Sequence, residues 1–325
     1  MKKLFIIIAS ILLLLPVFGC TKSTEKVLLV FSYHAEFSWV AEEARGVDQI
    51  LKDRGVETEK FYMDTKRNTG TDWKNSMAEA AVRKIDEFKP DLVIVFDDNA
   101  CELVAKRYIG KSLPIVFCGM NGEPADYGFP AQNITGVIER THIKATVNFL
   151  KRLVPGVEKL AIITDDNPTS RIFSTNIKKT ILPVEISEFY ATNDFDDWKA
   201  KVEELQTRVD AIYMFTYHTI KARGGEASLP SEDVLNWTLE NNRLPDCGIS
   251  DYIIRDGVLC GVTVSGYEQG RAAAEIAVRI LNGEKPADIE IERPEKGTPM
   301  VNQARAKALN IEIPADVLKE AKLLP

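Results

Sequence analysis

The sequence predicts an α/β protein of two lobes, each built as a doubly wound, Rossmann-like parallel sheet. Its 325 residues suffice for two ordinary domains, each with its own core. Short β-branched runs alternate with longer amphipathic stretches, which favours parallel sheets with helices on both faces and right-handed crossovers. Short sequences also recur between the halves: FSYH at 31–34 and FTYH at 215–218, FDDN at 96–99 and TDDN at 164–167.

Five strands and three helices are expected in the first half of the chain. The run VLLVF is wholly apolar, as in a buried strand, and apolar residues then recur at helical spacing from Val40 to Leu51. VETEKFYM alternates apolar and polar residues, which is typical of a strand. The expected strands are 27–31, 56–63, 91–96, 114–118 and 134–139, and the expected helices are 40–51, 72–88 and 99–108.

The second half repeats this alternation and ends in a long helix and a tail. Gly283 is suited to cap the C-terminus of the helix that starts at 266. The tail at 300–321 should add a strand-like run and two short helices. The expected strands are 159–164, 184–190, 210–215, 246–250 and 257–264, and the expected helices are 142–153, 168–180, 195–207, 231–242 and 266–282.

The first twenty residues predict export rather than a part of the fold. A basic start precedes an almost wholly apolar run from Leu4 to Phe18, as in a secretory signal peptide. That run is short for a membrane span, which needs about 20 apolar residues, although an uncleaved N-terminal anchor is the alternative. Cys20 follows a small residue and resembles a bacterial lipobox cysteine, although Val17 and Phe18 depart from the usual pattern. We expect residues 1–19 to be removed and Cys20 to carry a lipid anchor at the cell envelope.

Charge and cysteine content exclude several functional classes. The net charge is −7, and removal of Lys2 and Lys3 with the signal peptide leaves 39 basic and 48 acidic residues, which disfavours nucleic acid as a partner. The chain has no CxxC pair, Walker loop, GxSxG elbow or HExxH motif, so we expect no metal, no cofactor and no enzymatic activity. Disulfides are possible but not required among Cys101, Cys118, Cys247 and Cys260. Cys247 and Cys260 could pair or remain buried free thiols.

The recurring tetrapeptides all lie at the carboxyl ends of expected strands. Ligands of open α/β sheets bind beyond these ends, where loops are polar and helices begin. If the two lobes face each other, the tetrapeptides should line one shared cleft. The acids and amides before the expected helices could alternatively serve only as N-caps, namely Asp97, Asp98, Asp165, Asp166 and Asn167. Tyr33 and Trp39 could simply pack a helix on the sheet. His34 and His218 could meet as a metal pair only with a third ligand.

Several long stretches resemble a known family. LPIVFCGMNGEPADYGFPAQNITGV, DAIYMFT, SGYEQGRAAAEIAVRILNGEKPADIEIE and VNQARAKALNIEIPADVL are similar to segments of ABC transporter substrate-binding lipoproteins related to tryptophan and tyrosine binders. The resemblance covers about 26–325. It implies a type 1 periplasmic binding protein fold with three crossovers, near 139–142, 264–266 and 289–300. Lobe 1 would then comprise 26–139 and 266–288, and lobe 2 would comprise 140–264 and 300–325.

The resemblance also implies site residues and a departure from the family. Many members have small or hydroxyl residues, which hold a ligand carboxylate, where this chain has Asp97 and Asp98. Two acidic side chains there disfavour an anion unless they point away or bind a cation. The resemblance places a ligand-facing acid at Asp251. The expected ligand-binding residues are Ser32, Tyr33, His34, Trp39, Asp97, Asp98, Asn99, Met120, Asn121, Asp165, Asp166, Asn167, Thr216, Tyr217, His218, Asp251, Tyr252 and Ser265.

The expected function is solute binding for an ABC importer. The two lobes would close on a small polar or aromatic ligand such as an amino acid, because closure follows from contacts made only when both lobes touch the ligand. The expected partners are a membrane permease and its cytoplasmic ATPase. The alternative is a sensory component that signals to a histidine kinase or chemoreceptor, since SYHAEFSW at 32–39 also resembles sensory input domains of this fold.

Overall fold

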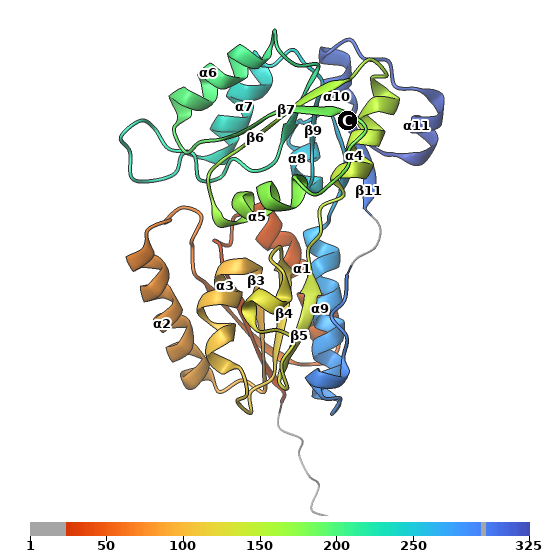
Figure 1. Cartoon of the computed structure of the whole chain (residues 1–325). Helices are drawn as coiled ribbons and strands as arrows, with labels where there is room; N and C mark the ends of the chain where they lie inside the picture. The colour runs from red at the N-terminus through yellow and green to blue at the C-terminus, as the bar shows by residue number, and fades with distance from the viewer. Residues whose placement is uncertain (1–23, 294–296) are drawn as a thin grey trace, which may run out of the picture.

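The computed structural model describes residues 24–293 and 297–325, and its chain forms two α/β lobes (Figure 1). The predicted signal peptide and Cys20 lie outside the described residues. No helix within the described ranges is long and apolar enough to cross a bilayer.

Lobe 1, defined by the five-stranded sheet, is wholly parallel with strand order β2-β1-β3-β4-β5. Helices α1 and α9 cover one face and meet Leu29 and Phe31, whereas α2 and α3 cover the other face and meet Leu28 and Val30. The strands are β1 Lys26–Phe31, β2 Glu57–Tyr62, β3 Leu92–Phe96, β4 Ile115–Met120 and β5 Ile134–Ile138. The helices are α1 Ser38–Lys52, α2 Thr71–Phe88, α3 Asp97–Leu103 and α9 Gly266–Leu281, with short 3-10 turns at Ala105–Tyr108, Pro124–Tyr127 and Pro286–Asp288.

Lobe 2, defined by the seven-stranded sheet, has the strand order β12-β11-β10-β9-β8-β6-β7. Helices α6, α7 and α8 pack on one face, and α4, α5, α10 and α11 pack on the other. The strands are β6 Lys159–Thr164, β7 Glu185–Ala191, β8 Ala211–Met214, β9 Asp246–Gly248, β10 Cys260–Thr263, β11 Thr298–Asn302 and β12 Lys322–Leu324. The helices are α4 Ile143–Leu153, α5 Pro168–Ile177, α6 Phe195–Leu205, α7 Ser231–Asn241, α8 Asp251–Arg255, α10 Gln303–Ala308 and α11 Ala315–Glu320.

The structure differs from the sequence-based expectation in four elements. The expected helix at 99–108 begins at Asp97 and ends at Leu103, and a 3-10 turn follows it. Helix α8 and strand β12 were not predicted. Strand β11 runs antiparallel to β10, so the sheet of lobe 2 is mixed rather than purely parallel. The reason is that β11 reaches this sheet from lobe 1, after α9, and not through a crossover helix of lobe 2.

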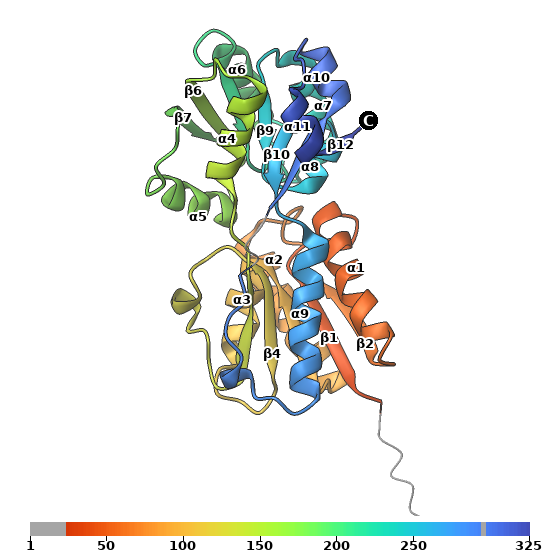
Figure 2. The ribbon, with the colours of Figure 1, turned by 90° about the vertical axis from the view of Figure 1, so that its right-hand side faces the viewer.

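Helix α9 joins distant parts of the sequence (Figure 2). It follows β10 of lobe 2 but packs along α1 of lobe 1, where Gly46 and Gly270 allow the two backbones to approach closely. The chain then runs beside β5, with Glu292 bridging Val137, before it returns to lobe 2 as β11. Lobe 1 is therefore built from two separate stretches of sequence.

The four described cysteines are free and buried. Cys247 and Cys260 lie opposite each other on the parallel strands β9 and β10. Of the two alternatives left open by the sequence, the structure has free thiols.

Candidate functional site

The carboxyl ends of the strands of both lobes meet at three cavities between the lobes. The polar cavity has a volume of about 320 Å³, the aromatic cavity about 30 Å³ and the histidine cavity about 390 Å³. Each is lined by residues that follow β1 or β2 in lobe 1 and by residues that follow β6, β8 or β9 in lobe 2. The two lobes therefore contribute jointly to each cavity.

An aromatic contact connects the lobes at the aromatic cavity. The Phe37 ring of lobe 1 lies 4.6 Å from the imidazole of His218 and 5.6 Å from the Tyr252 ring, both edge-on and both from lobe 2. Tyr33 contacts Phe37 at 5.7 Å between ring centroids. Such edge-to-face pairs stabilise contact by about 0.5–1.5 kcal/mol beyond area burial. Phe37 was not among the expected site residues, although it stands in the quoted segment SYHAEFSW.

Asp97 and Asp98, which follow β3, have different surroundings. Asp98 accepts hydrogen bonds from the amide of Gly122 at 2.9 Å and from the hydroxyl of Tyr127 at 2.7 Å. Asp97 has a positive φ of 62° and accepts from Trp39 Nε1 at 3.2 Å, while its Oδ2 has no hydrogen-bond partner. Burial raises the pKa of both carboxyls, that of Asp97 well above its usual value. The capping alternative is wrong for both, because the N-cap of α3 is Phe96 and no side chain caps it.

Two further buried carboxyls lie near Asp97. Burial raises the pKa of Glu139, at the end of β5, to about 7, and its Oε2 accepts a hydrogen bond from Asn121 at 3.0 Å. Burial also raises the pKa of Glu43 on α1 well above its usual value, and the charge of Asp97 adds to this effect. The interior of lobe 1 next to the aromatic cavity thus holds an acidic cluster of Glu43, Asp97, Asp98 and Glu139.

Lys66 is a buried cation close enough to interact with this cluster, and sequence reasoning missed it. The side chain is only 5% exposed, and its ammonium lies 4.5 Å from the centre of the Tyr33 ring and 5.3 Å from that of Phe37. Desolvation lowers its pKa, although Asp165, Asp97 and Glu139 oppose this effect. Lys66 lines both the polar and the aromatic cavity. Its position after β2, another strand end, was the signal that could have found it.

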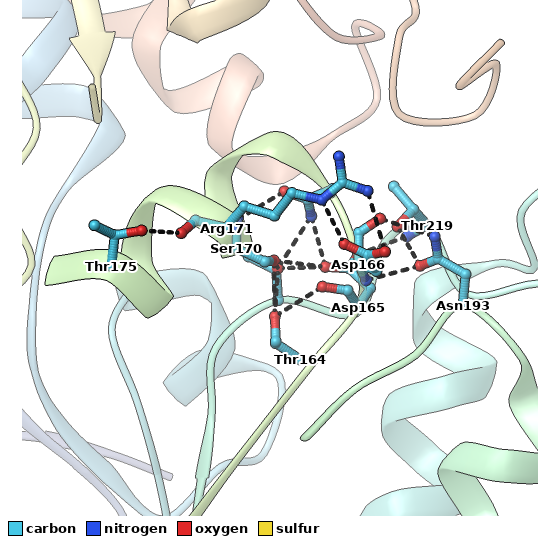
Figure 3. A network of polar contacts seen from close by, with 10 residues as sticks. Thr164, Asp165, Asp166, Ser170, Arg171, Thr175, Asn193 and Thr219 are labelled. Atoms are coloured by element: carbon cyan, nitrogen blue, oxygen red, sulfur yellow. Dashed lines mark hydrogen bonds and ion pairs between the residues drawn. The ribbon is translucent and has the colours of Figure 1, made fainter. Parts of the chain in front are cut away.

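In lobe 2, Asp165 anchors a network of polar side chains (Figure 3). It is fully buried and accepts hydrogen bonds from the amide of Thr219 at 2.7 Å, from Asn167 Nδ2 at 2.6 Å and from the Thr216 hydroxyl at 2.5 Å. Asn167 in turn caps α5 by accepting from the Ser170 amide at 3.0 Å. Asp165 thus fixes the loops that follow β6 and β8, and of the three candidate caps Asp165, Asp166 and Asn167 it is Asn167 that caps α5.

Asp166, the next residue, points to the polar cavity instead. Its carboxylate pairs with Arg171 Nε at 2.8 Å and with Nη2 of the same side chain at 3.1 Å. Its amide donates to Asn193 at 2.9 Å. The two acids of the TDDN tetrapeptide therefore have separate surroundings, one within lobe 2 and one at the interface.

The structure brings eleven of the expected site residues to these cavities. The other seven do not line these cavities: Ser32 and Asp165 hold strand-end loops, and Asp98 is hydrogen-bonded within lobe 1. Asp251 pairs with Arg255 at 2.7 Å. Cavity-lining residues are Tyr33, His34, Trp39, Asp97, Asn99, Asn121, Asp166, Asn167, Thr216, His218 and Tyr252, and those outside the linings are Ser32, Asp98, Met120, Asp165, Tyr217, Asp251 and Ser265.

His34 and His218 both line the histidine cavity. Burial lowers the pKa of both imidazoles, and that of His218 falls well below its usual value. Nδ1 of His34 lies 3.5 Å from Asp64, and Nδ1 of His218 is buried without a hydrogen-bond partner. Across the described ranges, no group of three His, Cys, Asp or Glu residues is placed to hold a metal ion.

Comparison with known proteins extends the resemblance found in the sequence. The family model described as ABC transporter substrate binding protein matches residues 36–324. The chain is 20% identical to a tyrosine-binding protein of Clostridioides difficile (strain R20291), over 99% of this chain and 96% of that protein. Among solved structures, an ABC domain in complex with L-Trp from Streptococcus pneumonia has a TM-score of 0.72 at 21% identity, covering 93% of this chain and all of that one. A conserved domain protein from Vibrio cholerae has a TM-score of 0.73 at 17% identity, covering 93% and 99%. These likenesses establish the two-lobed type 1 periplasmic binding protein fold.

Proposed function

The chain belongs to the ABC transporter substrate-binding protein family, and on that premise we propose that it is the extracytoplasmic receptor of an importer for a small polar or aromatic ligand. An amino acid or a related compound is the favoured class of ligand. The relative that binds tyrosine and the fold neighbour solved with L-Trp support this class. Residues 1–19 would act as the signal peptide and Cys20 as the lipidated anchor.

The observation that carries the proposal is the meeting of strand ends from both lobes at shared cavities. Tyr33, Lys66 and Asn99 reach the polar cavity from lobe 1, and Asn167 and Thr219 reach it from lobe 2. A ligand that contacts both sets stabilises the arrangement in which the lobes touch, which is the physical basis of closure. The eleven cavity-lining residues named above are the proposed ligand contacts.

We propose three connections as the hinge for this closure. They lie near 139–142, 264–266 and 289–300, between a first lobe of 26–139 with 266–288 and a second of 140–264 with 300–325. The closed pair of lobes would present one surface to a permease whose cytoplasmic partner hydrolyses ATP. This mode of action requires binding without chemical change of the ligand.

The first prediction concerns ligand binding by the purified protein. Mass spectrometry of the compound released on denaturation, followed by a thermal-shift screen of amino acids, aromatic acids and amines, should identify a ligand that raises the melting temperature. The melting temperature should rise further as the ligand concentration increases, because bound ligand adds about 2.7 kcal/mol to the free energy of unfolding at a hundredfold excess over Kd. The ligand should be recovered intact. Sugars and purines serve as the comparison set, and a response to these alone would contradict the proposed ligand class.

A further inference from the structure

We propose that the polar cavity is the subsite for an anionic group of the ligand, a carboxylate or a phosphoryl group held between Lys66 and Lys74. This inference rests on the proposed function and names the charge class of the ligand. It differs from the pose that family resemblance implies, in which a ligand carboxylate lies at the position of Asp97 and Asp98.

The polar cavity is built from both lobes and is lined mainly by hydrogen-bonding groups. Lobe 1 contributes the loop after β2 and the start of α2, including Lys66, Thr71 and Lys74. Lobe 2 contributes the start of α5 and the loop after β7, including Thr169 and Asn193. At about 320 Å³, the cavity is at the small end of the range for ligand pockets. It is therefore large enough for the charged group of a ligand and a few further atoms of that ligand.

The positive charge of this cavity is not balanced by its own residues. Arg171 is paired with Asp166, whereas the ammonium groups of Lys66 and Lys74 form no hydrogen bond or ion pair with any described residue. Lys66 is the stronger indication, because it is 95% buried and lines the cavity, and a buried cation is costly unless it is paired. Asp165, Asp97 and Glu139 attract its charge, but none of them forms an ion pair with it. The pKa of Lys74 is lowered by desolvation and by the charge of Arg171 from the opposite lobe. An anion bound in the cavity would offset the repulsion between Lys74 and Arg171.

Two helix N-termini add to the positive potential. Helix α2 has 18 residues and its N-cap is Gly70, which offers no side chain to the first amides. Helix α5 begins at Pro168, and its second residue, Thr169, lines the cavity. The positive end of a helix dipole favours anions. Hydroxyls of Thr71 and Thr169 at these ends supply further donors.

The remainder of the interface disfavours an anion. The acidic cluster of Glu43, Asp97, Asp98 and Glu139 lies beside the aromatic cavity. A carboxylate there would meet repulsion from any of these acids that is ionised, and it would find no cation of its own. The polar and aromatic cavities share Tyr33, Lys66 and Thr169 in their linings. A ligand would therefore place its anionic group in the polar cavity and direct its uncharged or aromatic part toward the aromatic residues.

The test compares compounds that share a skeleton and differ in charge. L-Tyrosine carries both charged groups, 3-(4-hydroxyphenyl)propanoate lacks the ammonium, and tyramine lacks the carboxylate. Succinate and inorganic phosphate probe the anion subsite without an aromatic ring. We expect calorimetric binding of the acids and no binding of tyramine, with the screen extended to matched acid, amide and amine forms of other amino acids. Binding by amines or neutral compounds alone would overturn the inference while leaving the proposed function intact. No binding by any compound would contradict both.

Variants test the two lysines directly. Lys74→Met and Lys66→Met should each raise the Kd of the best-binding acid at least tenfold, because hydrogen bonds to charged groups contribute this much or more. Lys84→Met is the matched control, since Lys84 lies on α2 with an exposure similar to that of Lys74 but pairs with Glu59 outside the cavity. The Kd of this variant for the same acid should stay within twofold of the wild-type value. Melting temperatures of the variants without added ligand separate lost binding from lost folding, and Lys74→Met, at a less buried position, keeps the test open if Lys66→Met folds poorly. Unchanged Kd values in both cavity variants would refute the proposed subsite.

Discussion

Glu139 is a buried acid whose pKa is raised into the physiological range. Its pKa is about 7 because burial disfavours the carboxylate, and Asp98 raises the pKa further while the hydrogen bond from Asn121 and the charges of Lys66 and Arg140 lower it. The native protein therefore keeps the Glu139 proton at pH values at which the unfolded chain, with its ordinary pKa near 4.5, has lost it. Such a group stabilises the fold below the unfolded pKa, and its contribution is lost as the pH rises through 7.

We predict that Glu139→Gln removes this part of the pH dependence. The free energy of unfolding of the wild type should fall by about 3 kcal/mol relative to the variant between pH 4.5 and pH 8, from about 1.4 kcal/mol per unit of pKa shift. Urea unfolding of both proteins at four pH values measures the difference. Subtracting the free energy of unfolding of the variant from that of the wild type cancels the contributions of His34 and His218. Their lowered pKa values change stability with pH in the opposite direction. Parallel pH profiles of the two proteins would show that Glu139 is ionised throughout.

Sequence reasoning found residues at the strand ends but not the buried charges among them. Tyr33, Asn99, Asn167 and His218 could be predicted because the end of an apolar run marks the edge of a parallel sheet. Lys66 and Glu43 could not, since their burial depends on segments far away in the sequence. Glu43 lies at a core-facing helical position of α1, where a charged residue is ordinarily assigned to the surface.

At the scale of elements, the contact of α1 with α9 depends on two glycines. A Cβ atom on Gly270 would lie 2.0 Å from the carbonyl oxygen of Glu43, and one on Gly46 would lie 2.1 Å from that of Tyr267. Both neighbours are backbone atoms, so a change of side-chain rotamer cannot relieve the overlap. The two helices would have to move apart, together with the chain segments that lead into lobe 2.

We predict that Gly270→Ala destabilises the protein, by about 1–3 kcal/mol or more. The direction is informative because an alanine within an exposed helix ordinarily stabilises it by about 1 kcal/mol relative to glycine. Thermal and urea unfolding measure the change. Gly156→Ala is the control, since its added Cβ meets no atom within 4 Å and its φ is not positive, and it should change stability by less than about 0.5 kcal/mol. Equal melting temperatures for the two variants would contradict the close-packing argument.

The long periodic elements were predictable, whereas the short ones depend on tertiary contacts. The strand at 159–164 was predicted with the bounds of β6 because its apolar run ends at polar residues on each side. Helix α8 has five residues and β12 three, too few to show a period. The antiparallel direction of β11 follows from its arrival out of lobe 1, which no local pattern encodes.

Across the whole molecule, one apolar cluster continues from lobe 1 into lobe 2. It includes Val40 and Trp39 of α1, Tyr252 of α8 and Met214 of β8, with Phe37 between them. Hydrogen bonds also cross the interface, among them those from Ser228 to the carbonyl of Lys66 at 3.1 Å and from Lys221 to Thr69 at 3.3 Å. The aromatic contacts of Phe37 are the part of this interface that a single substitution can remove.

Phe37 of lobe 1 contacts two aromatic side chains of lobe 2. Phe37→Ala would remove both edge-to-face contacts with His218 and Tyr252, which should weaken the contact by at least about 1 kcal/mol and shift the equilibrium toward separated lobes about fivefold. Small-angle scattering should then give a larger radius of gyration for the variant than for the wild type, and a saturating ligand should reduce the difference because it contacts both lobes. Phe189→Ala is the control, since Phe189 contacts Phe173 within lobe 2. If the two variants scatter alike, contacts other than the aromatic ones set the position of the lobes.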